Sequence, residues 1–88
     1  MMIKWIDVNE ELPKTEMDEL DDGTKFYVSE WVLISILNKD CSKRVDVAFY
    51  ESYKEKGCWY SEEESFSADG GRVTHWMPFP DPPNYLED

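Results

Sequence analysis

The chain has 88 residues, of which 20 are acidic and 9 are basic, so its formal net charge at pH 7 is −11. This length allows one small domain, and four Trp, five Tyr and four Phe are available to fill its core. A field of this sign repels phosphate groups, which argues against direct binding to nucleic acid or to an anionic membrane.

The acidic residues are concentrated toward the two ends of the chain. Residues 1–22 carry eight acids against two bases and residues 61–88 carry seven against one, so each of these segments has a net charge of −6. Residues 23–60 carry five acids against six bases and have a net charge of +1. Such a distribution attracts a basic protein surface, and it also keeps a Trp-rich protein soluble.

The first strand is predicted at Ile3–Val8, with Trp5 as its anchor. Pro13 disfavours helix at the residue before it, so Asn9–Pro13 is predicted to be a turn or a single helical turn that leaves the strand. Residues 14–25 are polar and acidic, and we expect an exposed loop in which Glu16–Leu20 forms a single helical turn.

Phe26–Leu37 is rich in β-branched and aromatic residues, and we predict one continuous strand there. Apolar side chains alternate onto both of its faces, which is typical of a central strand or of one covered by another segment or by a partner. One face is expected to carry Val28, Val32, Ile34 and Ile36, and the other to carry Tyr27, Trp31, Leu33 and Leu37.

Turn residues at Asn38–Ser42 lead into a second strand at Lys43–Tyr53, so the two strands are predicted to form a hairpin. After a turn at Lys54–Gly57, a third strand begins at Cys58. Residues 61–71 are predicted to form a second exposed acidic loop, and Arg72–Met77 a further strand.

Four prolines follow this last strand, at Pro78, Pro80, Pro82 and Pro83, and they predict a stiff, polyproline-like strap over a small core. We therefore expect one mainly β domain over residues 1–88. Its fold is predicted to be an antiparallel meander of four or five strands that curls into a partly open barrel or roll.

Three blocks of this sequence belong together. They are W-I-D-V-N-E-E-L-P at residues 5–13, A-F-Y with W-Y at residues 48–50 and 59–60, and V-T-H-W-M-P-F-P-D-P-P at residues 73–83. This combination resembles Domain of Unknown Function family 551, a group of small proteins of phages and prophage-bearing bacteria. The resemblance implies a phage or prophage origin and a small β fold. It implies no reaction.

Catalytic and metal chemistry find little support in the sequence. Cys41, Cys58 and His75 lack the paired spacing of a zinc site, and Leu20 and Ser29 occupy ligand positions of an EF-hand loop. His75 is the only histidine, no nucleophile motif accompanies it, and we predict a packed histidine in a protein that is not an enzyme and needs no cofactor.

The start of the chain has no apolar signal segment, and no apolar run approaches the ~18 residues that span a membrane. The protein is therefore expected in the cytoplasm of a bacterial host, with Cys41 and Cys58 as unbridged thiols. A homo-oligomer is compatible with the sequence.

Two functions remain open. The first is binding of a host or phage protein with a basic surface, for example as an inhibitor of a nucleic-acid-handling or defence factor. The residues expected to carry this contact are Glu16, Asp18, Glu19, Asp21, Asp22, Glu62, Glu63 and Glu64. The alternative is sequestration of a small, nucleotide-like ligand. Its aromatic pocket is expected to contain Trp31, Tyr50, Trp59, His75 and Trp76.

Overall fold

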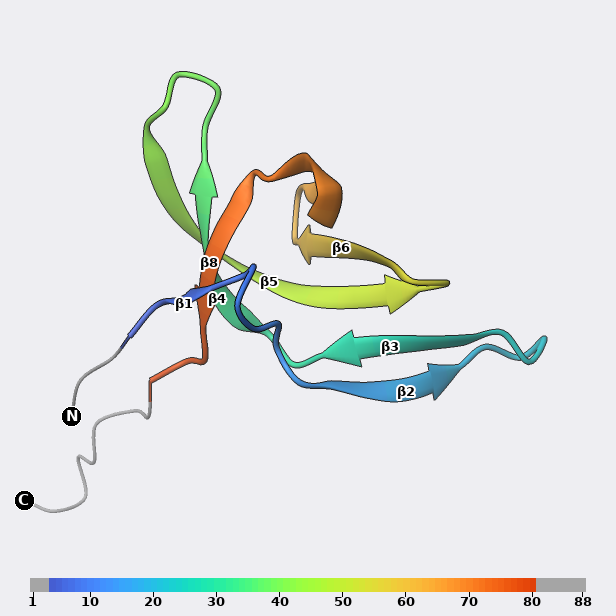
Figure 1. Cartoon of the computed structure of the whole chain (residues 1–88). Helices are drawn as coiled ribbons and strands as arrows, with labels where there is room; N and C mark the ends of the chain where they lie inside the picture. The colour runs from blue at the N-terminus through green and yellow to red at the C-terminus, as the bar shows by residue number, and fades with distance from the viewer. Residues whose placement is uncertain (1–3, 81–88) are drawn as a thin grey trace, which may run out of the picture.

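Eight antiparallel strands and one short 3-10 helix make up the part of the chain that the computed structural model describes, residues 4–80 (Figure 1). Their bounds are β1 Ile6–Asp7, β2 Thr15–Glu19, β3 Lys25–Ser29, β4 Val32–Leu37, β5 Lys43–Tyr53, β6 Lys56–Ser61, β7 Ser65–Ser67, η1 Ala68–Gly70 and β8 Val73–Met77.

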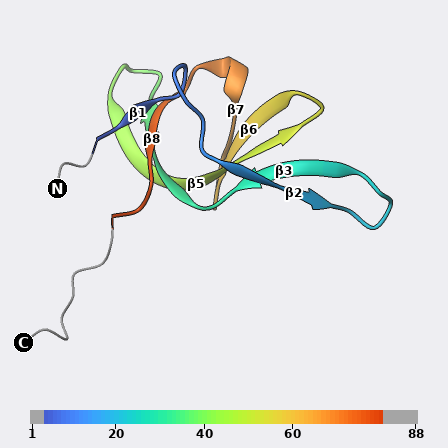
Figure 2. The same ribbon diagram turned by 60° about the horizontal axis from the view of Figure 1, so that its bottom comes forward.

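The sheet is organised around β5, whose eleven residues bind neighbours along both edges. On one edge β5 pairs first with β4 and then with β3, and on the other edge its second half pairs with β6. The sheet order is β1-β8-β4-β5-β3-β2, with β7 attached to β6. The predicted fold class is confirmed: the protein is mainly β, and its antiparallel sheet curls into a half-barrel (Figure 2). The described residues form eight strands where four or five were predicted, and β8 lies between β1 and β4, which departs from a simple meander.

The single strand predicted over Phe26–Leu37 is interrupted by a bulge. Val32 pairs with Ala48 and Val28 pairs with Glu51, so three residues of one strand lie opposite two of the other. One extra residue switches the face onto which the following side chains project. Val28 therefore does not continue the buried row of β4, and it is only half-buried.

The inner face of the curled sheet carries the core. Val32, Ile34 and Ile36 on β4 alternate with half-buried neighbours, as an apolar period of two predicts. They pack in one cluster with Ala48, Tyr50, Trp59, Phe66, Val73 and Trp76. Trp76 is 7% exposed and its indole nitrogen donates to the main-chain oxygen of Glu11 at 2.8 Å, which ties the segment after β1 to the core.

Gly57 is required by the packing of Tyr50. A Cβ at residue 57 would lie 2.0 Å from the Tyr50 hydroxyl oxygen, because the Tyr50 ring, which is opposite Trp59 in the β5–β6 ladder, reaches diagonally over the glycine. Burial is also the main reason why the pKa of the Tyr50 hydroxyl is raised.

Two predicted loops contain strands. Thr15–Glu19 is neither loop nor helical turn but strand β2, which pairs with β3 along its whole length. Within residues 61–71, β7 pairs with β6 and places Phe66 in the core at 5% exposure. In both segments the polar sequence does not indicate a strand, and pairing with the neighbouring strand stabilises the extended conformation.

The other local predictions are confirmed for two strands and corrected near the N-terminal end of the described chain. The predicted strands at Lys43–Tyr53 and Arg72–Met77 are present as β5 and β8. Of the strand predicted over Ile3–Val8, Ile3 lies outside the described residues and β1 covers Ile6–Asp7. Trp5 is 36% exposed and so is no buried anchor. The first part of the predicted strap, residues 78–80, is exposed, and Pro82 and Pro83 lie outside the described residues.

Replacing Trp76 by alanine is expected to lower the free energy of unfolding by about 3–5 kcal/mol, as large-to-small changes in a core do. Trp31→Ala is the matched control, because Trp31 is 45% exposed and its loss should cost clearly less than that of Trp76. Urea unfolding followed by fluorescence measures both. Equal losses for the two variants would show that Trp76 does not hold the core together.

Candidate functional site

The β2–β3 hairpin, which we call the acidic arm (residues 15–29), projects from the body of the sheet (Figures 1 and 2). Its exposed acidic side chains are Glu16, Asp18 and Glu19 on β2 and Asp21 and Asp22 in the turn. None of the five forms an ion pair with any residue between 4 and 80. The arm therefore presents a net negative charge to the solvent, because its one basic residue, Lys25 opposite Glu19, offsets only one of the five acids.

The turn of the acidic arm is held by local hydrogen bonds. The main-chain nitrogen of Leu20 donates to the oxygen of Thr24 at 2.8 Å, and Gly23 adopts the left-handed backbone at φ 89° that glycine tolerates. The Thr24 side chain and main-chain nitrogen both donate to the Asp22 carboxylate, and these bonds lower the pKa of that carboxyl group. Asp22 is therefore ionised at neutral pH.

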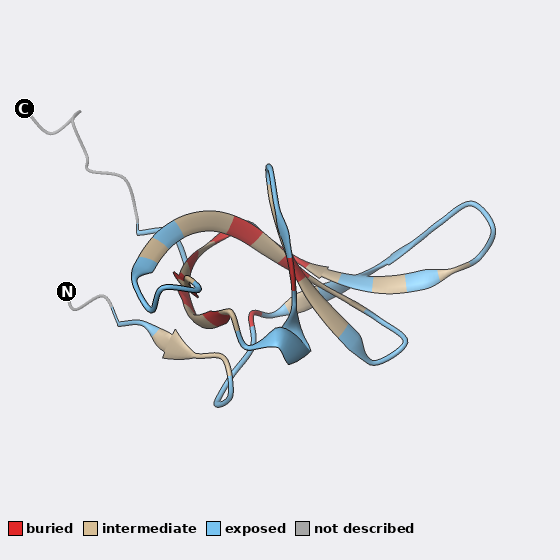
Figure 3. Cartoon of the chain, turned by 90° about the horizontal axis from the view of Figure 1, so that it is seen from above, coloured by how far each residue is buried: buried red, intermediate tan, exposed pale blue. Residues whose placement is uncertain are grey.

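Apolar side chains accompany the charges of the arm. Met17 and Tyr27 lie opposite each other across the β2–β3 ladder and are 52% and 48% exposed, and Leu20 beside the turn is 53% exposed. Figure 3 shows that the arm is exposed and half-buried along most of its length. Exposed apolar and aromatic side chains next to charge are a common composition of protein-binding surfaces.

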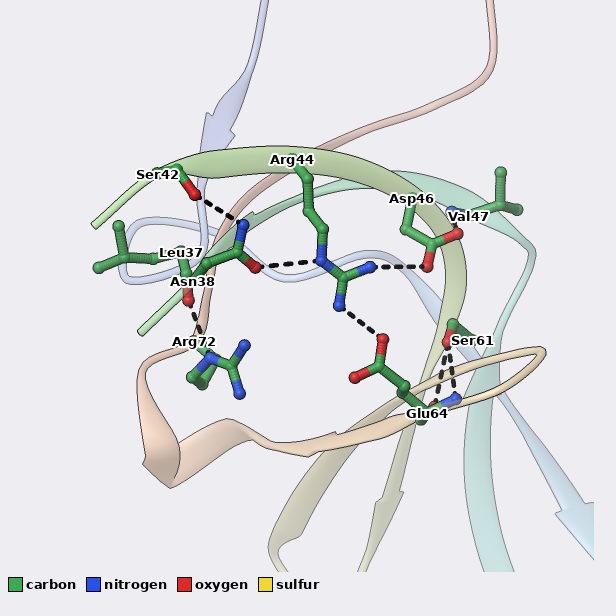
Figure 4. Close-up of polar contacts among 9 residues, drawn as sticks. All are labelled: Leu37, Asn38, Ser42, Arg44, Asp46, Val47, Ser61, Glu64 and Arg72. Atoms are coloured by element: carbon green, nitrogen blue, oxygen red, sulfur yellow. Dashed lines mark hydrogen bonds and ion pairs between the residues drawn. The ribbon is translucent and has the colours of Figure 1, made fainter. Parts of the chain in front are cut away.

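The second acidic segment lies elsewhere and is partly neutralised. Glu64 accepts from the Arg44 guanidinium at 2.5 Å, and Arg44 also lies 3.6 Å from Asp46 (Figure 4). Glu62 and Glu63 are exposed in the same turn.

The two acidic segments do not form one surface. The turn that carries residues 62–64 follows Ser61, which pairs with Ala48. The arm begins to pair with β5 near Ser52 and continues away from Ala48. The six residues of β6 therefore separate the two regions by roughly 20 Å of strand.

The structure does not assemble the aromatic pocket predicted from the sequence. Tyr50, Trp59 and Trp76 pack in the core, where Trp59 is 1% exposed. Trp31 instead contacts Phe49 edge-to-face at 5.0 Å, and Phe49 stacks on Tyr60 at 5.5 Å, so these three form a separate aromatic row.

His75 belongs to neither aromatic group. It is half-buried, pairs with Ser35 on β4, and has its Nδ1 atom 3.0 Å from the Thr74 hydroxyl oxygen. This position fits the packed histidine that the sequence predicts.

A cleft of about 670 Å³ lies between the outer ends of the β2–β3 and β5–β6 hairpins. We call it the hairpin cleft. Aromatic and apolar side chains contribute much of its lining, with two lysines and one glutamate: Leu20, Phe26, Glu51, Tyr53, Lys54, Lys56 and Tyr60. The sequence does not reveal this site, because β3 and β5 form it by diverging beyond Tyr27 and Ser52.

The turn beside the hairpin cleft has an unusual backbone. Lys54 and Glu55 have φ values of 50° and 67°, although glycine or asparagine is usual at such positions. The Lys54 ammonium group lies 5.3 Å from the centre of the Tyr53 ring. On the cleft wall, a hydrogen bond with Cys58 is the main cause of the raised pKa of Tyr60.

Within the described chain, no three His, Cys, Asp or Glu side chains lie close enough to hold a metal ion. Cys41 and Cys58 are both free. Across residues 4–80, no helix has the length and apolarity needed to span a membrane.

Comparison with curated proteins and with solved structures found no match. The family described as "Protein of unknown function (DUF551)" matches residues 4–84, which includes all the described strands. The match covers all three sequence blocks that resemble this family. The chain therefore belongs to the DUF551 family.

Proposed function

We propose that this protein is a non-enzymatic, phage-type accessory protein that binds the basic surface of a host or phage protein through the acidic arm. The observation that carries the proposal is the arm itself, a projecting hairpin with five exposed acids that have no ionic partner among residues 4–80. An inhibitor of a nucleic-acid-handling or defence factor fits this description, because such factors present basic surfaces to phosphate groups.

The distribution of contacts supports an external role for the arm. The core cluster draws on β4 to β8, and neither β2 nor β3 contributes a residue to it. Core packing therefore does not account for β2 and β3, two five-residue strands that extend away from the core. The acidic side chains of the arm can steer a basic partner toward it, and the exposed Met17 and Tyr27 offer apolar contact area.

A purely solubilising role for the acids predicts a different behaviour. Solubility depends on net charge and hardly on position, whereas recognition depends on which residues carry the charge. The protein offers a matched comparison, because Asp18 with Glu19 and Glu62 with Glu63 are both exposed acidic pairs in separate regions.

Reversing Asp18 and Glu19 to lysine changes the net charge by +4, two units for each residue, and Glu62→Lys with Glu63→Lys changes it equally. Both variants should melt close to the parent, since exposed charges contribute little to stability. Proteins captured from bacterial lysate by the parent should be retained by the Glu62/Glu63 variant and lost by the arm variant. Association rates of a purified partner should fall by about tenfold or more at low salt for the arm variant alone.

Two results would contradict the proposal. Equal losses for both variants would mean that only net charge matters. Retention of every captured protein by the arm variant, at the parental association rate, would mean that the arm is no binding element.

The hairpin cleft supports a second candidate function, the binding of a small aromatic anion such as a nucleotide. Its volume of about 670 Å³ lies within the range of small-molecule sites. Tyr53, Tyr60 and Phe26 offer surfaces against which a flat ring can pack, and Lys54 and Lys56 offer charge for a phosphate group. Glu51 opposes an anion at the same site, so the ligand charge must lie toward the two lysines.

Adenosine 5′-monophosphate is a suitable probe for this second function. It is expected to bind the parent with a dissociation constant below about 1 mM and to shift the NMR signals of the cleft residues. Lys54→Glu with Lys56→Glu should abolish binding, whereas the matched pair Lys39→Glu with Lys43→Glu, beside the turn between β4 and β5, should not. Equal effects of the two pairs, or no shifts at several millimolar, would eliminate the cleft as a nucleotide site.

A further inference from the structure

We propose that the partner adds an extended, basic segment as a strand to the free edge of β2. This inference rests on the proposed function, in which the acidic arm is the binding element, and it specifies how the arm binds. β2 ends the sheet order and pairs only with β3 among the described residues. Its second edge is therefore available for main-chain hydrogen bonds.

The phase of the β2–β3 ladder shows which residues face this edge. Bonded and non-bonded pairs alternate along an antiparallel ladder, and the bond from Leu20 to Thr24 fixes that pair as bonded. Counting back in steps of two, Asp18 and Glu16 direct their main-chain groups toward β3. Those of Glu19, Met17 and Thr15 point away from β3, toward the free edge.

A hydrogen bond at the end of the strand agrees with this phase. The main-chain nitrogen of Glu19 donates to the Asp18 carboxylate at 2.8 Å, so it is directed away from β3. At this position the outward main-chain nitrogen is therefore already bonded to the Asp18 side chain. Met17 and Thr15 provide the outward main-chain groups for an added strand.

The side chains of β2 specify the chemistry of that strand. Glu16 and Asp18 project to one face, and Met17 lies between them on the other, because side chains alternate along a strand. A complementary strand carries basic residues opposite Glu16 and Asp18 and an apolar residue opposite Met17. A second copy of β2 is excluded by this pattern, since it would place acids against acids.

A cavity of about 510 Å³ beside the start of β2 fits one such basic side chain. Glu16 and Glu30 line it together with Lys14, and its apolar lining comes from Pro13, Val28, Val32, Trp76 and Pro78. The aliphatic stem of a lysine or arginine can pack against these apolar groups while its charged end approaches a carboxylate. The cavity therefore favours a long cation over a short one.

The test uses a capped nine-residue peptide of alternating lysine and valine, and a control peptide with the same residues in two blocks. The alternating peptide should shift the amide NMR signals of Thr15 and Met17 in the full chain and bind more tightly than the block peptide. Met17→Pro removes one outward N–H and no bond to β3, and it should weaken binding roughly fivefold to tenfold. Met17→Ala keeps the N–H and controls for loss of the side chain.

Unchanged core signals of Trp59 and Trp76 will show that the proline variant is folded; if they change, Thr15→Pro removes the other outward N–H at the start of the strand. Equal affinity of the proline and alanine variants would overturn strand addition. If Asp18→Lys with Glu19→Lys then still abolishes binding, the acidic arm binds by charge alone and the proposed function stands. If that reversal is also without effect, the arm is not the binding element.

Discussion

The bulge where β3 and β4 meet on β5 is the constraint from which the rest of the architecture follows. At this point the main-chain nitrogen of Tyr50 donates to the Ser29 hydroxyl oxygen at 2.9 Å, in a buried position. The serine hydroxyl in turn donates to the oxygen of Glu30 at 2.8 Å. A side chain thus satisfies a main-chain donor that the interrupted ladder would leave unpaired, at a site where an unpaired group costs about 1–3 kcal/mol.

This bulge separates two regions with different physical roles. On one side, β4, β5 and β8 align Val32, Ile34 and Trp76 toward the core. On the other side, the chain leaves the body of the sheet as the acidic arm, and the arm diverges from the β5–β6 hairpin to leave the hairpin cleft. The core can therefore stay intact while charge, exposed apolar groups and a free strand edge gather on the arm. Recognition by an element that core packing does not constrain is common in small domains.

The success of the sequence predictions depended on which force orders each segment. Strand β5 could be predicted, because β-branched and aromatic side chains alternate along it, although its buried face carries Ala48 and Tyr50 while Val45 is 59% exposed. β2 could not, because its polar residues become a strand only through pairing with β3. The sequence identified the five acids of the arm as candidates. It did not show that residues 62–64 lie in a separate region, because their position depends on where β6 ends. The aromatic pocket is not assembled, because Tyr50, Trp59 and Trp76 pack in the core whereas Trp31, next to the buried Val32, lies on the opposite face against Phe49.

Native-state amide hydrogen exchange, resolved by residue along β2, tests the central claim that this edge is free. A free edge gives alternating exchange: the amides of Glu16 and Asp18, which face β3, are protected, whereas those of Thr15 and Met17 exchange within about tenfold of the rate in an unstructured peptide. Core amides such as Ile34 and Ala48 should be the slowest. Similar protection of all four β2 amides would show that the edge is already covered and therefore is not free to accept a strand.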